Sequence, residues 1–533
     1  MPMKGLGNTA TGENADVQVR DESETIGSKL SPLTWSVLGV LVTSAAVVLR
    51  LYQLEVKPFH HDEGVNAQFV QAMLQPPYTF RYDPANYHGP TLFYFGKASA
   101  IVFGLADFAL RFVPAFFSIV TVLLMFSLRR RIGSVGALVA AALVAASPGA
   151  VYFGRYFIHE SLLVCFTIAA FLAACEYHRT WRRGWLYLAA ASLALMFATK
   201  ETAIVSVGVM ACAFVTALLL VPLRSRIGVQ RPESLRADAQ PDGNRNSWGA
   251  ARRWSFPSKA FIIAAAIFIA INVAFYSSFF THSTGVTDAL RAFSLWSKTG
   301  TQDHVNPWWM YIRWFAEEEG VLLVLGVLGI VITLWSARIL FTTLVALWGL
   351  GIFAAYSLIP YKTPWLTLNF VIPLAIMAGW AVEVCHLRSS AAQRRVLALV
   401  TFVIVGYSAY RAIDLNFVAY DDERRPYVYA HTSREVLQLV QKIREVRARV
   451  PAGTSINIAV LSPEHYPLLW YLRNYPVGYY GAILKTDAGI LLASQKQDEA
   501  VRKEFGGSYV RLGSYKLRPG VDIIAYVRAD LMR

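Results

Sequence analysis

The chain has 533 residues, of which 55% are hydrophobic and only 16% are charged. Soluble domains are about 25% charged, and apolar runs long enough to cross a bilayer recur along most of this sequence. These properties exclude a soluble multidomain enzyme. The net charge of +15 favours basic cytoplasmic loops over nucleic-acid binding. All four cysteines lie in apolar stretches, which excludes a disulfide framework and a zinc site.

The first three quarters of the chain predict a disordered tail followed by an all-α, polytopic membrane domain. Residues 1–31 are polar and almost free of aromatic side chains, which is typical of a disordered segment. Residues 32–411 contain about eleven apolar runs, each close to the roughly 17–25 residues that cross the hydrocarbon core. The predicted spans are 34–51, 108–128, 134–153, 158–177, 184–199, 203–222, 259–278, 320–336, 340–356, 365–385 and 395–411.

The charges of the connecting loops predict their side of the membrane, because cytoplasmic loops are enriched in Lys and Arg. With a cytoplasmic N-terminus, Arg129–Arg131 and the basic loop 223–258 fall inside. The loops 52–107 and 279–319, which carry clusters of acidic residues, then fall outside. The sequence therefore predicts a multi-pass protein of the cell membrane whose C-terminal region, 412–533, is extracytoplasmic.

The first outer loop is predicted to fold against the membrane surface. Residues 90–106 are apolar but short, and counting them as a span would place the later arginine-rich loops outside. We expect this segment to lie in the interface or to re-enter it. Residues 61–75 have helical apolar spacing and predict an interfacial helix. Its predicted apolar face consists of Val65, Phe69, Ala72 and Met73.

The C-terminal region, 412–533, predicts a small α/β domain. Residues 433–449 have helical apolar spacing, and the runs 456–461 and 522–527 are typical of strands. The predicted buried face of the helix consists of Val436, Leu437, Val440 and Ile443. This region carries no glycine-rich phosphate-binding motif and no metal-ligand spacing, so its role is not predicted.

Two adjacent carboxylates follow the first predicted span. Polar groups at the ends of membrane spans are costly unless they are used or paired. Asp62 and Glu63 come directly after His61, and an acid in this position can accept a proton from an acceptor hydroxyl or hold a divalent cation. The alternative is that Asp62 only caps the helix that begins there. We favour a catalytic role, because a cap requires one carboxylate and gains nothing from the histidines.

Three further polar clusters lie at the same predicted side. Arg155 precedes His159 and Glu160 between two closely spaced spans, where an arginine and a glutamate either form a functional pocket or pair to close a turn. Lys200–Glu201 ends another span, and Lys362 lies between two later ones. Each lysine either binds a lipid phosphate or extends to the interface. His88 is a weaker candidate, because the following Gly-Pro already explains a turn.

Together these clusters suit one kind of reaction. Carboxylates beside cations on the outer side can transfer a group from an anionic lipid carrier to a hydroxyl, with the cation stabilising the departing phosphate and the carboxylate activating the acceptor. The sequence shows no nucleotide-binding signature, which favours a membrane-embedded donor.

Several motifs resemble the GT-C superfamily of polyprenyl-phosphate-sugar-dependent glycosyltransferases over roughly residues 34–222. The resemblance is strongest to the protein O-mannosyltransferase-like branch, which includes the lipid A aminoarabinose transferases. The motifs are Asp62-Glu63 with the following Glu-Gly-x-Asn-Ala run, Ala109–Pro114, Ser147-Pro148, Arg155–Glu160 and Ala198–Glu201. Within this branch, three runs look like the prokaryotic subfamily of flippase-activity-associated proteins. These runs are Tyr152–Glu160, Tyr361–Trp365 and Tyr427–Thr432.

The resemblance implies roles for individual residues. Asp62 corresponds to the acid expected to act as base or to orient the acceptor. Glu160 corresponds to a second acid of the family that is commonly Asp. Lys200 corresponds to the family's lysine after the fifth span; it is followed here by Glu201, whereas Gly is frequent at that position in the family. The family is generally inverting, which implies direct displacement at the anomeric carbon. The C-terminal domain would, by the same analogy, help to hold the acceptor.

The predicted site therefore has three groups of residues. The catalytic candidates are Asp62, Glu63 and Glu160; the phosphate-binding candidates are Arg155, Lys200 and Lys362; the accessory candidates are His61, His88, His159 and Glu201. If a divalent cation takes part, Asp62 and Glu160 are its predicted ligands. No other cofactor is predicted.

The predicted function is an integral-membrane hexosyl- or pentosyltransferase acting on the extracytoplasmic side. Its partners would be a polyprenyl-phosphate sugar donor, membrane lipids, and a protein, lipid or glycan acceptor. The alternatives are a transporter or flippase, or a noncatalytic partner for lipid-linked sugars. A transporter is expected to place charges near the midplane and often shows internal repeats, and the sequence shows no repeat.

Overall fold

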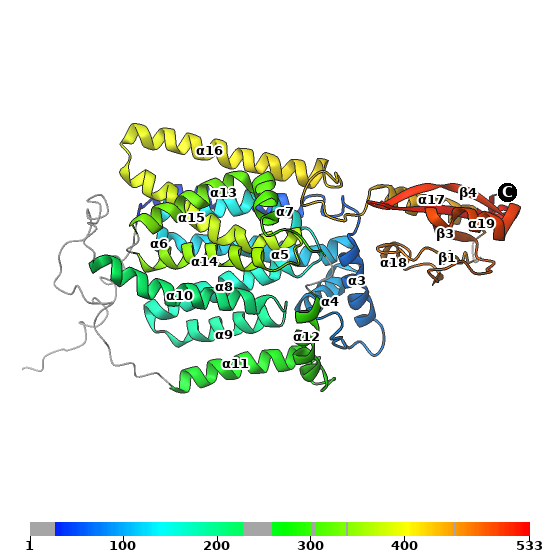
Figure 1. Ribbon diagram of the computed structural model, residues 1–533, viewed down its shortest axis with the longest axis horizontal. Coiled ribbons are helices and arrows are strands. Elements are labelled where there is room, and N and C mark those ends of the chain that lie inside the picture. Colours follow the sequence, from blue (N-terminus) through cyan, green and yellow to red (C-terminus); the bar gives the residue numbers. More distant parts are fainter. Residues whose placement is uncertain (1–26, 227–257, 300–303, 337–338, 452–454, 533) are drawn as a thin grey trace, which may run out of the picture.

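The computed structural model describes residues 27–226, 258–299, 304–336, 339–451 and 455–532. A bundle of long helices forms the larger part, and a small domain with a β-sheet extends from one end of it (Figure 1). We call this end of the bundle the sheet-domain end. Residues 1–26 of the predicted disordered tail and most of the predicted basic loop 223–258 lie outside the described residues. The last five residues of the predicted tail, 27–31, are described, and the Ser28 hydroxyl donates to Glu383 at 3.0 Å.

The helical domain contains the elements α2 to α16. Their bounds are α2 Pro32–Leu51, α3 His61–Met73, α4 Thr91–Phe103, α5 Asp107–Met125, α6 Arg129–Ala146, α7 Pro148–Gly154, α8 Glu160–Thr180, α9 Arg183–Phe197, α10 Ala203–Arg226, α11 Ser258–Tyr276, α12 Gly285–Thr299, α13 Met310–Ser336, α14 Leu340–Leu358, α15 Leu368–Arg388 and α16 Ala391–Ile413. The chain is therefore mostly helical, as the composition predicts.

Nine segments of the described residues are long and apolar enough to cross a membrane. One of them has 40 residues and contains both α5 and α6, and these two helices are antiparallel. Near the start of α2, the Trp35 ring packs 5.9 Å from that of Phe126 at the end of α5. Near the end of α2, Arg50 donates to the Ala145 carbonyl at the end of α6, at 2.9 Å. Together with the shorter apolar helix α9, these helices account for the eleven predicted spans.

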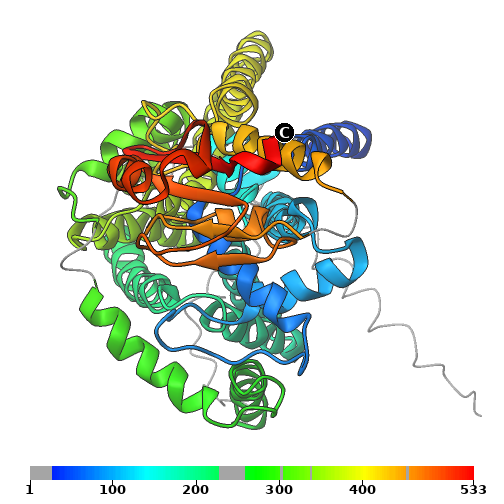
Figure 2. The ribbon, with the colours of Figure 1, turned by 90° about the vertical axis from the view of Figure 1, so that its right-hand side faces the viewer.

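The predicted cytoplasmic and outer loops lie at opposite ends of the bundle. The Arg129 guanidinium lies 5.1 Å from the Trp35 ring, at the end where α2 begins. Asp62 follows the other end of α2, at the sheet-domain end. Seen from that end, α2 and α16 stand at the edge of the bundle (Figure 2). Both carry exposed apolar side chains such as Val40 and Phe402, as expected of helices in contact with lipid.

Two short helices form the first outer loop. α4 has 13 residues and packs against α3 and α5, so it is too short to be a span, as predicted for 90–106. α3 is the predicted helix, and of its predicted apolar face Met73 is buried inside the protein, Val65 and Phe69 are half-buried, and Ala72 is exposed. The buried side chains of α3 are Glu63, Asn66, Ala67, Val70 and Met73. Apolar spacing misses this face because two of its residues are polar groups with partners inside the protein.

The small domain contains a five-stranded mixed sheet. Its elements are α17 Glu435–Arg449, β1 Ile458–Val460, α18 Leu468–Tyr471, β2 Val477–Tyr479, β3 Ile490–Ser494, α19 Asp498–Phe505, β4 Tyr509–Arg518 and β5 Val521–Arg528. The strand order is β2-β1-β3-β5-β4; β1 is parallel to β2 and β3, and β5 is antiparallel to β3 and β4. α17, β1 and β5 fall where a helix and two strands are predicted. On α17 the buried face includes Leu439 in place of the predicted Leu437.

Residues 414–432 connect α16 to the sheet domain, and we call them the strap. The strap packs on the helical domain: Tyr427 is buried with its ring 5.2 Å from that of Phe153, and His431 is buried beside Tyr156. The fold of the sheet domain therefore begins near Ser433, about twenty residues later than the end of the last span suggests.

The sheet domain is docked on the first outer loop through α18. The Trp470 ring stacks on Phe59 with centroids 4.9 Å apart, and the Trp470 Nε1–H donates to Asp107 at 2.7 Å. The Phe59 amide donates to the Tyr471 hydroxyl at 2.8 Å. In Figure 1, α18 lies next to α3. The sheet domain therefore stands over the loop that carries the first candidate acids.

Candidate active site

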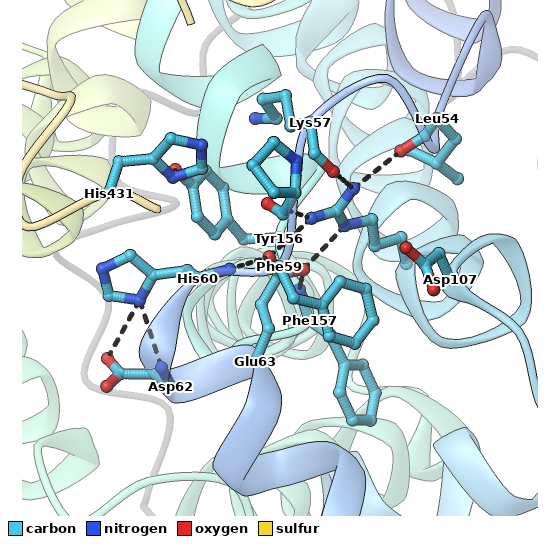
Figure 3. A network of polar contacts seen from close by, with 12 residues as sticks. Leu54, Lys57, Phe59, His60, Asp62, Glu63, Asp107, Tyr156, Phe157 and His431 are labelled. Atoms are coloured by element: carbon cyan, nitrogen blue, oxygen red, sulfur yellow. Dashed lines mark hydrogen bonds and ion pairs between the residues drawn. The ribbon is translucent and has the colours of Figure 1, made fainter. Parts of the chain in front are cut away.

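The N-terminus of α3 presents Asp62 and Glu63 in different environments. His60 is the capping residue: its Nδ1 accepts from the Asp62 amide at 3.2 Å, and its own amide donates to Glu63 at 2.9 Å. Capping is thus carried out by His60 and Glu63. The Asp62 carboxylate lies 3.9 Å from His60 Nδ1, and 41% of its side chain is exposed. Figure 3 shows the Asp62 and Glu63 carboxylates pointing in different directions.

Glu63 is held by a buried arginine that sequence reasoning did not select. Arg111 on α5 donates to both Glu63 carboxylate oxygens, each at 2.7 Å, and both side chains are fully buried. The Phe157 amide also donates to Glu63, at 2.9 Å. Arg111 further binds the carbonyls of residues 54, 57 and 58. Because its lone pairs are engaged, Glu63 fits a scaffold role and does not fit the predicted role of a base. An arginine within an apolar span was the signal for this pair.

Arg155 is also part of the scaffold. Its guanidinium is fully buried and donates to four main-chain carbonyls at the end of α2, those of residues 49, 50, 52 and 53. It also lies 4.6 Å from the Phe417 ring of the strap. The last carbonyls of a helix lack partners within the helix, and a cation there is favoured by the helix dipole. The arginine therefore caps α2, which leaves it poorly placed for the predicted contact with a lipid phosphate.

Glu160, Lys200, Glu201 and His88 form a buried network between α8, α9 and α4. Lys200 forms an ion pair with Glu160, and the Glu201 carboxylate lies 2.9 Å from His88 Nδ1. Burial alone would lower the pKa of Lys200, but the two adjacent carboxylates outweigh burial and raise it. The lysine is therefore protonated, as a phosphate-binding group must be. The pairing of Arg155 with Glu160, which was the structural alternative for these two residues, is absent from the described residues; Glu160 pairs with Lys200.

The two histidines of this region are close to each other. The His88 and His159 rings lie 4.8 Å apart. Burial lowers the pKa of His159 well below its usual value, and His88 and Lys200 lower it further. The main chain after His88 is fixed by hydrogen bonds to the end of α9: the Gly89 amide donates to the Thr199 carbonyl at 3.1 Å. A Cβ atom at Gly89 would lie 2.1 Å from the Ala198 carbonyl oxygen, so this close approach requires glycine.

Tyr361 lies in the loop between α14 and α15. Burial raises the pKa of its hydroxyl, and the charges of Lys200, Asp62 and Glu160 also act on it. This shared electrostatic influence favours the predicted arrangement. The convergence of these residues, which are separated by up to 140 positions along the chain, stays a prediction.

Lys362 binds main-chain groups of its own region. Its amide donates to the His304 carbonyl at 3.0 Å, and its Nζ donates to the Ile359 carbonyl at 2.5 Å, just after α14. The Nζ also lies 5.9 Å from the Tyr311 ring. Burial lowers the pKa of Lys362. The side chain therefore binds the loop that follows α14, and Lys200 remains as the phosphate-binding candidate near Asp62.

The strap contributes residues that sequence reasoning did not assign to the site. His431 Nδ1 lies 2.7 Å from the Tyr156 hydroxyl, and the His431 ring stacks 6.2 Å from that of His60. His60 Nε2 is within 3.1 Å of the Tyr429 carbonyl. Figure 3 shows His431, Tyr156 and His60 grouped on one side of Glu63. The strap thus supports the residue that caps α3 next to Asp62.

Lys57 is a third buried lysine, and no sequence signal identified it. Its Nζ lies 3.9 Å and 4.2 Å from the ring centroids of Tyr152 and Tyr156, and 3.4 Å from the Tyr152 carbonyl. Burial, together with Arg155 and Arg111, lowers the pKa of Lys57 well below its usual value. In the sequence it is one lysine in a polar loop, and nothing near it predicts burial.

His61 faces the sheet domain. Its ring lies 4.8 Å from that of Tyr466, and its Nδ1 lies 3.3 Å from Arg518 Nη1. Burial lowers the pKa of His61. This predicted accessory residue therefore contacts the sheet domain.

The expected metal pair does not fit the donor set. Glu160 is paired with Lys200, whose charge repels a cation. The nitrogen of His60 nearest Asp62 already accepts an amide hydrogen. Over the described ranges of the chain, no group of three or more His, Cys, Asp and Glu residues is placed to hold a metal ion.

The site thus combines one accessible carboxylate with one buried, protonated lysine. Asp62 can accept a proton from a hydroxyl, and Lys200 can stabilise a leaving phosphate as a point charge. The Glu63–Arg111 pair and Arg155 hold the surrounding chain in place.

Comparisons with known proteins identify the fold. Residues 87–232 match the family described as dolichyl-phosphate-mannose-protein mannosyltransferase. No curated protein gives a significant match over the chain. The structure is similar to that of ArnT from Cupriavidus metallidurans in the apo state, with 14% sequence identity, 94% of this chain and 99% of that chain covered, and a TM-score of 0.65.

Two further structures agree. ArnT from the same organism bound to undecaprenyl phosphate matches with 14% identity, the same coverage and a TM-score of 0.58. The Archaeoglobus fulgidus oligosaccharyltransferase tethered to an acceptor peptide matches with 12% identity, covering 94% of this chain and 76% of that chain, with a TM-score of 0.56. The predicted fold class is confirmed, and the subfamily stays a prediction. This multi-pass membrane protein has the fold of the GT-C superfamily of glycosyltransferases.

Proposed function

We propose that the protein is an integral-membrane glycosyltransferase. It transfers a sugar from a polyprenyl-phosphate donor to a hydroxyl acceptor on the extracytoplasmic face, where the sheet-domain end of the bundle lies. The related structures support the class of donor, because one of them is an ArnT bound to undecaprenyl phosphate. The enrichment of Arg in every second loop, on the side predicted to be cytoplasmic, supports the orientation.

The observation that carries this proposal is the state of Asp62. Its neighbour Glu63 is held by Arg111, whereas the Asp62 carboxylate is partly exposed. A general base must reach the proton that it accepts, and of these two adjacent acids Asp62 meets this condition. Lys200, whose charge acts together with that of Asp62 on the Tyr361 hydroxyl, supplies the positive charge for the phosphate.

The reaction then proceeds in one displacement. The acceptor hydroxyl oxygen attacks the anomeric carbon, and its proton passes to Asp62. The bond from the anomeric carbon to the phosphate oxygen breaks, and the polyprenyl phosphate leaves with the bonding electrons and is stabilised by Lys200. Attack opposite the leaving group inverts the anomeric configuration. Glu160 and Glu201 keep Lys200 protonated, and Glu160 yields its place when the phosphate binds.

The test uses the full chain in lipid nanodiscs with a panel of polyprenyl-phosphate-linked hexoses and pentoses and a membrane extract as acceptor source. The measured quantity is the polyprenyl phosphate released. Asp62→Asn removes the base while keeping the side-chain shape, and we expect the rate to fall about 10²–10⁴-fold. Asp83→Asn is the matched control, because Asp83 is an exposed acid of the same loop that accepts the Ala85 amide.

An Asp62→Asn variant that inserts normally and releases polyprenyl phosphate at the wild-type rate would remove Asp62 from the mechanism. If the wild type moves labelled lipid across the bilayer without releasing polyprenyl phosphate from any donor, the protein is a transporter and the proposal fails.

A further inference from the structure

A row of aromatic rings extends from the candidate active site onto the sheet domain. His61, next to Asp62, lies with its ring 4.8 Å from that of Tyr466. The Tyr466 ring lies 5.1 Å from His465, and the His465 ring lies 5.3 Å from Tyr479 at the end of β2. All four side chains are half-buried, so each leaves part of its ring accessible. We call these four residues the aromatic row.

The aromatic row is not explained by the packing of the two domains alone. Docking is carried by Trp470, which is buried, and by Tyr471, which is half-buried; they contact Asp107 and Phe59. Within the row, His61 reaches Arg518 of the sheet domain, and the Tyr466 hydroxyl donates to Gln68 at 2.9 Å. Among the described residues, the ring contacts of His465 and Tyr479 are with each other and with Tyr466 of the same domain.

Polar groups border the aromatic row. Arg518 lies 3.3 Å from His61 and pairs with Glu464, whose side chain is 48% exposed. His465 Nδ1 is buried without a hydrogen-bond partner in the described part of the chain. A buried polar atom without a partner costs free energy, and because this nitrogen bonds in the plane of the ring, a ligand hydroxyl that supplies the missing partner would have to approach the ring edge.

We propose that the aromatic row is the acceptor subsite and that its ligand is an oligosaccharide. The proposal rests on the glycosyltransferase function above and names the acceptor as a glycan. The C–H face of a pyranose carries partial positive charge and packs on the negative face of an aromatic ring. Sugar hydroxyls meanwhile bind the flanking charged and amide groups, here Arg518, Glu464 and Gln68.

The direction of the aromatic row fits this role. Each step between ring centroids is close to the length of one hexose unit, so successive sugars contact successive rings. The row begins at the residue preceding Asp62, which places the end of a bound chain next to the base. Tyr480, which follows Tyr479 and is 50% exposed, extends the aromatic surface beyond the row.

The experiment measures binding separately from catalysis. The full chain in nanodiscs is mixed with maltopentaose, α-1,6-mannopentaose or chitopentaose, and saturation transfer from protein to sugar protons is recorded by NMR. We expect transfer to at least one of these probes. Tyr479→Leu and Tyr466→Leu, which keep apolar volume but remove the ring, should reduce it at least tenfold. Tyr479→Phe and Tyr466→Phe are the matched controls and should retain it, provided that all four variants keep the wild-type melting temperature.

Each outcome decides the inference. If the wild type transfers saturation to none of the three oligosaccharides, or if the leucine variants bind as the wild type does, the inference is overturned. It is also overturned if Ser- and Thr-containing peptides, and not the sugars, bind in a way that the leucine variants abolish. Asp62→Asn should bind the sugars normally. If the sugars bind but no donor releases polyprenyl phosphate, the subsite stands and the transferase proposal fails.

Discussion

At the scale of single residues, the site depends on two neighbouring carboxylates with different partners. Glu63 accepts four hydrogen bonds in a buried pair with Arg111, whereas Asp62 stays accessible. The sequence predicted the acid pair and its position, but it could not assign the two roles, because the partner of Glu63 comes from a span about fifty residues away. Nor could it show that the Arg155 guanidinium donates its hydrogen bonds to the carbonyls at the end of α2.

Removing the charge of Glu63 should unfold the site rather than only slow the reaction. Glu63→Gln leaves Arg111 as an uncompensated buried charge, and breaking such a pair costs about 3–5 kcal/mol. We expect a large drop in the melting temperature of the purified protein. Glu423→Gln, which breaks the exposed pair with Lys516, is the control and should cost about 1 kcal/mol or less. Equal melting temperatures for both variants would contradict the structural role of Glu63.

The buried histidines predict a loss of stability in acid. Burial lowers the pKa of His159 and of His431 well below the usual value of 6.5. Below that pH the unfolded chain binds protons that the folded chain does not, so the free energy of unfolding falls as the pH decreases. We expect the melting temperature to decline from about pH 6.5 downwards. The double variant His159→Asn, His431→Asn should decline less steeply; a slope equal to that of the wild type would show that other groups are responsible.

At the scale of elements, hydrophobic periodicity predicted the long helices well and the short ones incompletely. The spans could be predicted from the sequence because crossing a bilayer requires long runs of apolar residues. The face of α3 that packs inside the protein was not predicted, because it contains Glu63 and Asn66. The strap was assigned to the soluble domain because its buried groups include tyrosine and histidine. Hydrophobic periodicity cannot predict the burial of a polar residue whose hydrogen-bond partner lies far away in the sequence.

The end of α2 offers a test of Arg155. Arg155→Gln leaves carbonyls at the end of this helix without partners, and each costs about 1–3 kcal/mol if buried. We expect a lower melting temperature, with unchanged affinity for undecaprenyl phosphate in the protein that remains folded. For Lys200→Gln we expect the opposite result, in which the affinity for undecaprenyl phosphate falls more than the melting temperature does. If Arg155→Gln loses affinity for undecaprenyl phosphate without losing stability, the result would support the predicted contact between Arg155 and the lipid phosphate.

At the scale of the whole molecule, the sheet domain is held over the first outer loop. The stacking of Trp470 on Phe59 and its hydrogen bond to Asp107 lie at the centre of this contact. The sequence predicted the existence and class of this domain. It could not predict the docking, which depends on side chains that are about 360 to 410 positions apart in the chain.

Weakening the docking should loosen the first outer loop. Trp470→Ala removes a buried aromatic side chain, a change that costs about 3–5 kcal/mol. We expect faster amide hydrogen exchange in residues 59–64 and reduced transfer, with the helical bundle intact. Trp308→Ala is the control, because Trp308 is 65% exposed. Unchanged exchange in Trp470→Ala would show that the two domains do not depend on this contact.

The central claim is that Asp62 lies beside a lipid-phosphate site on the extracytoplasmic face. The most direct measurement is labelling of single cysteines in intact cells with a membrane-impermeant thiol reagent, after replacement of the four native cysteines. The account predicts that Asp62→Cys is labelled from outside, that undecaprenyl phosphate slows this labelling, and that Arg130→Cys is labelled only after permeabilisation. Labelling of Arg130→Cys in intact cells, with Asp62→Cys protected until permeabilisation, would contradict it.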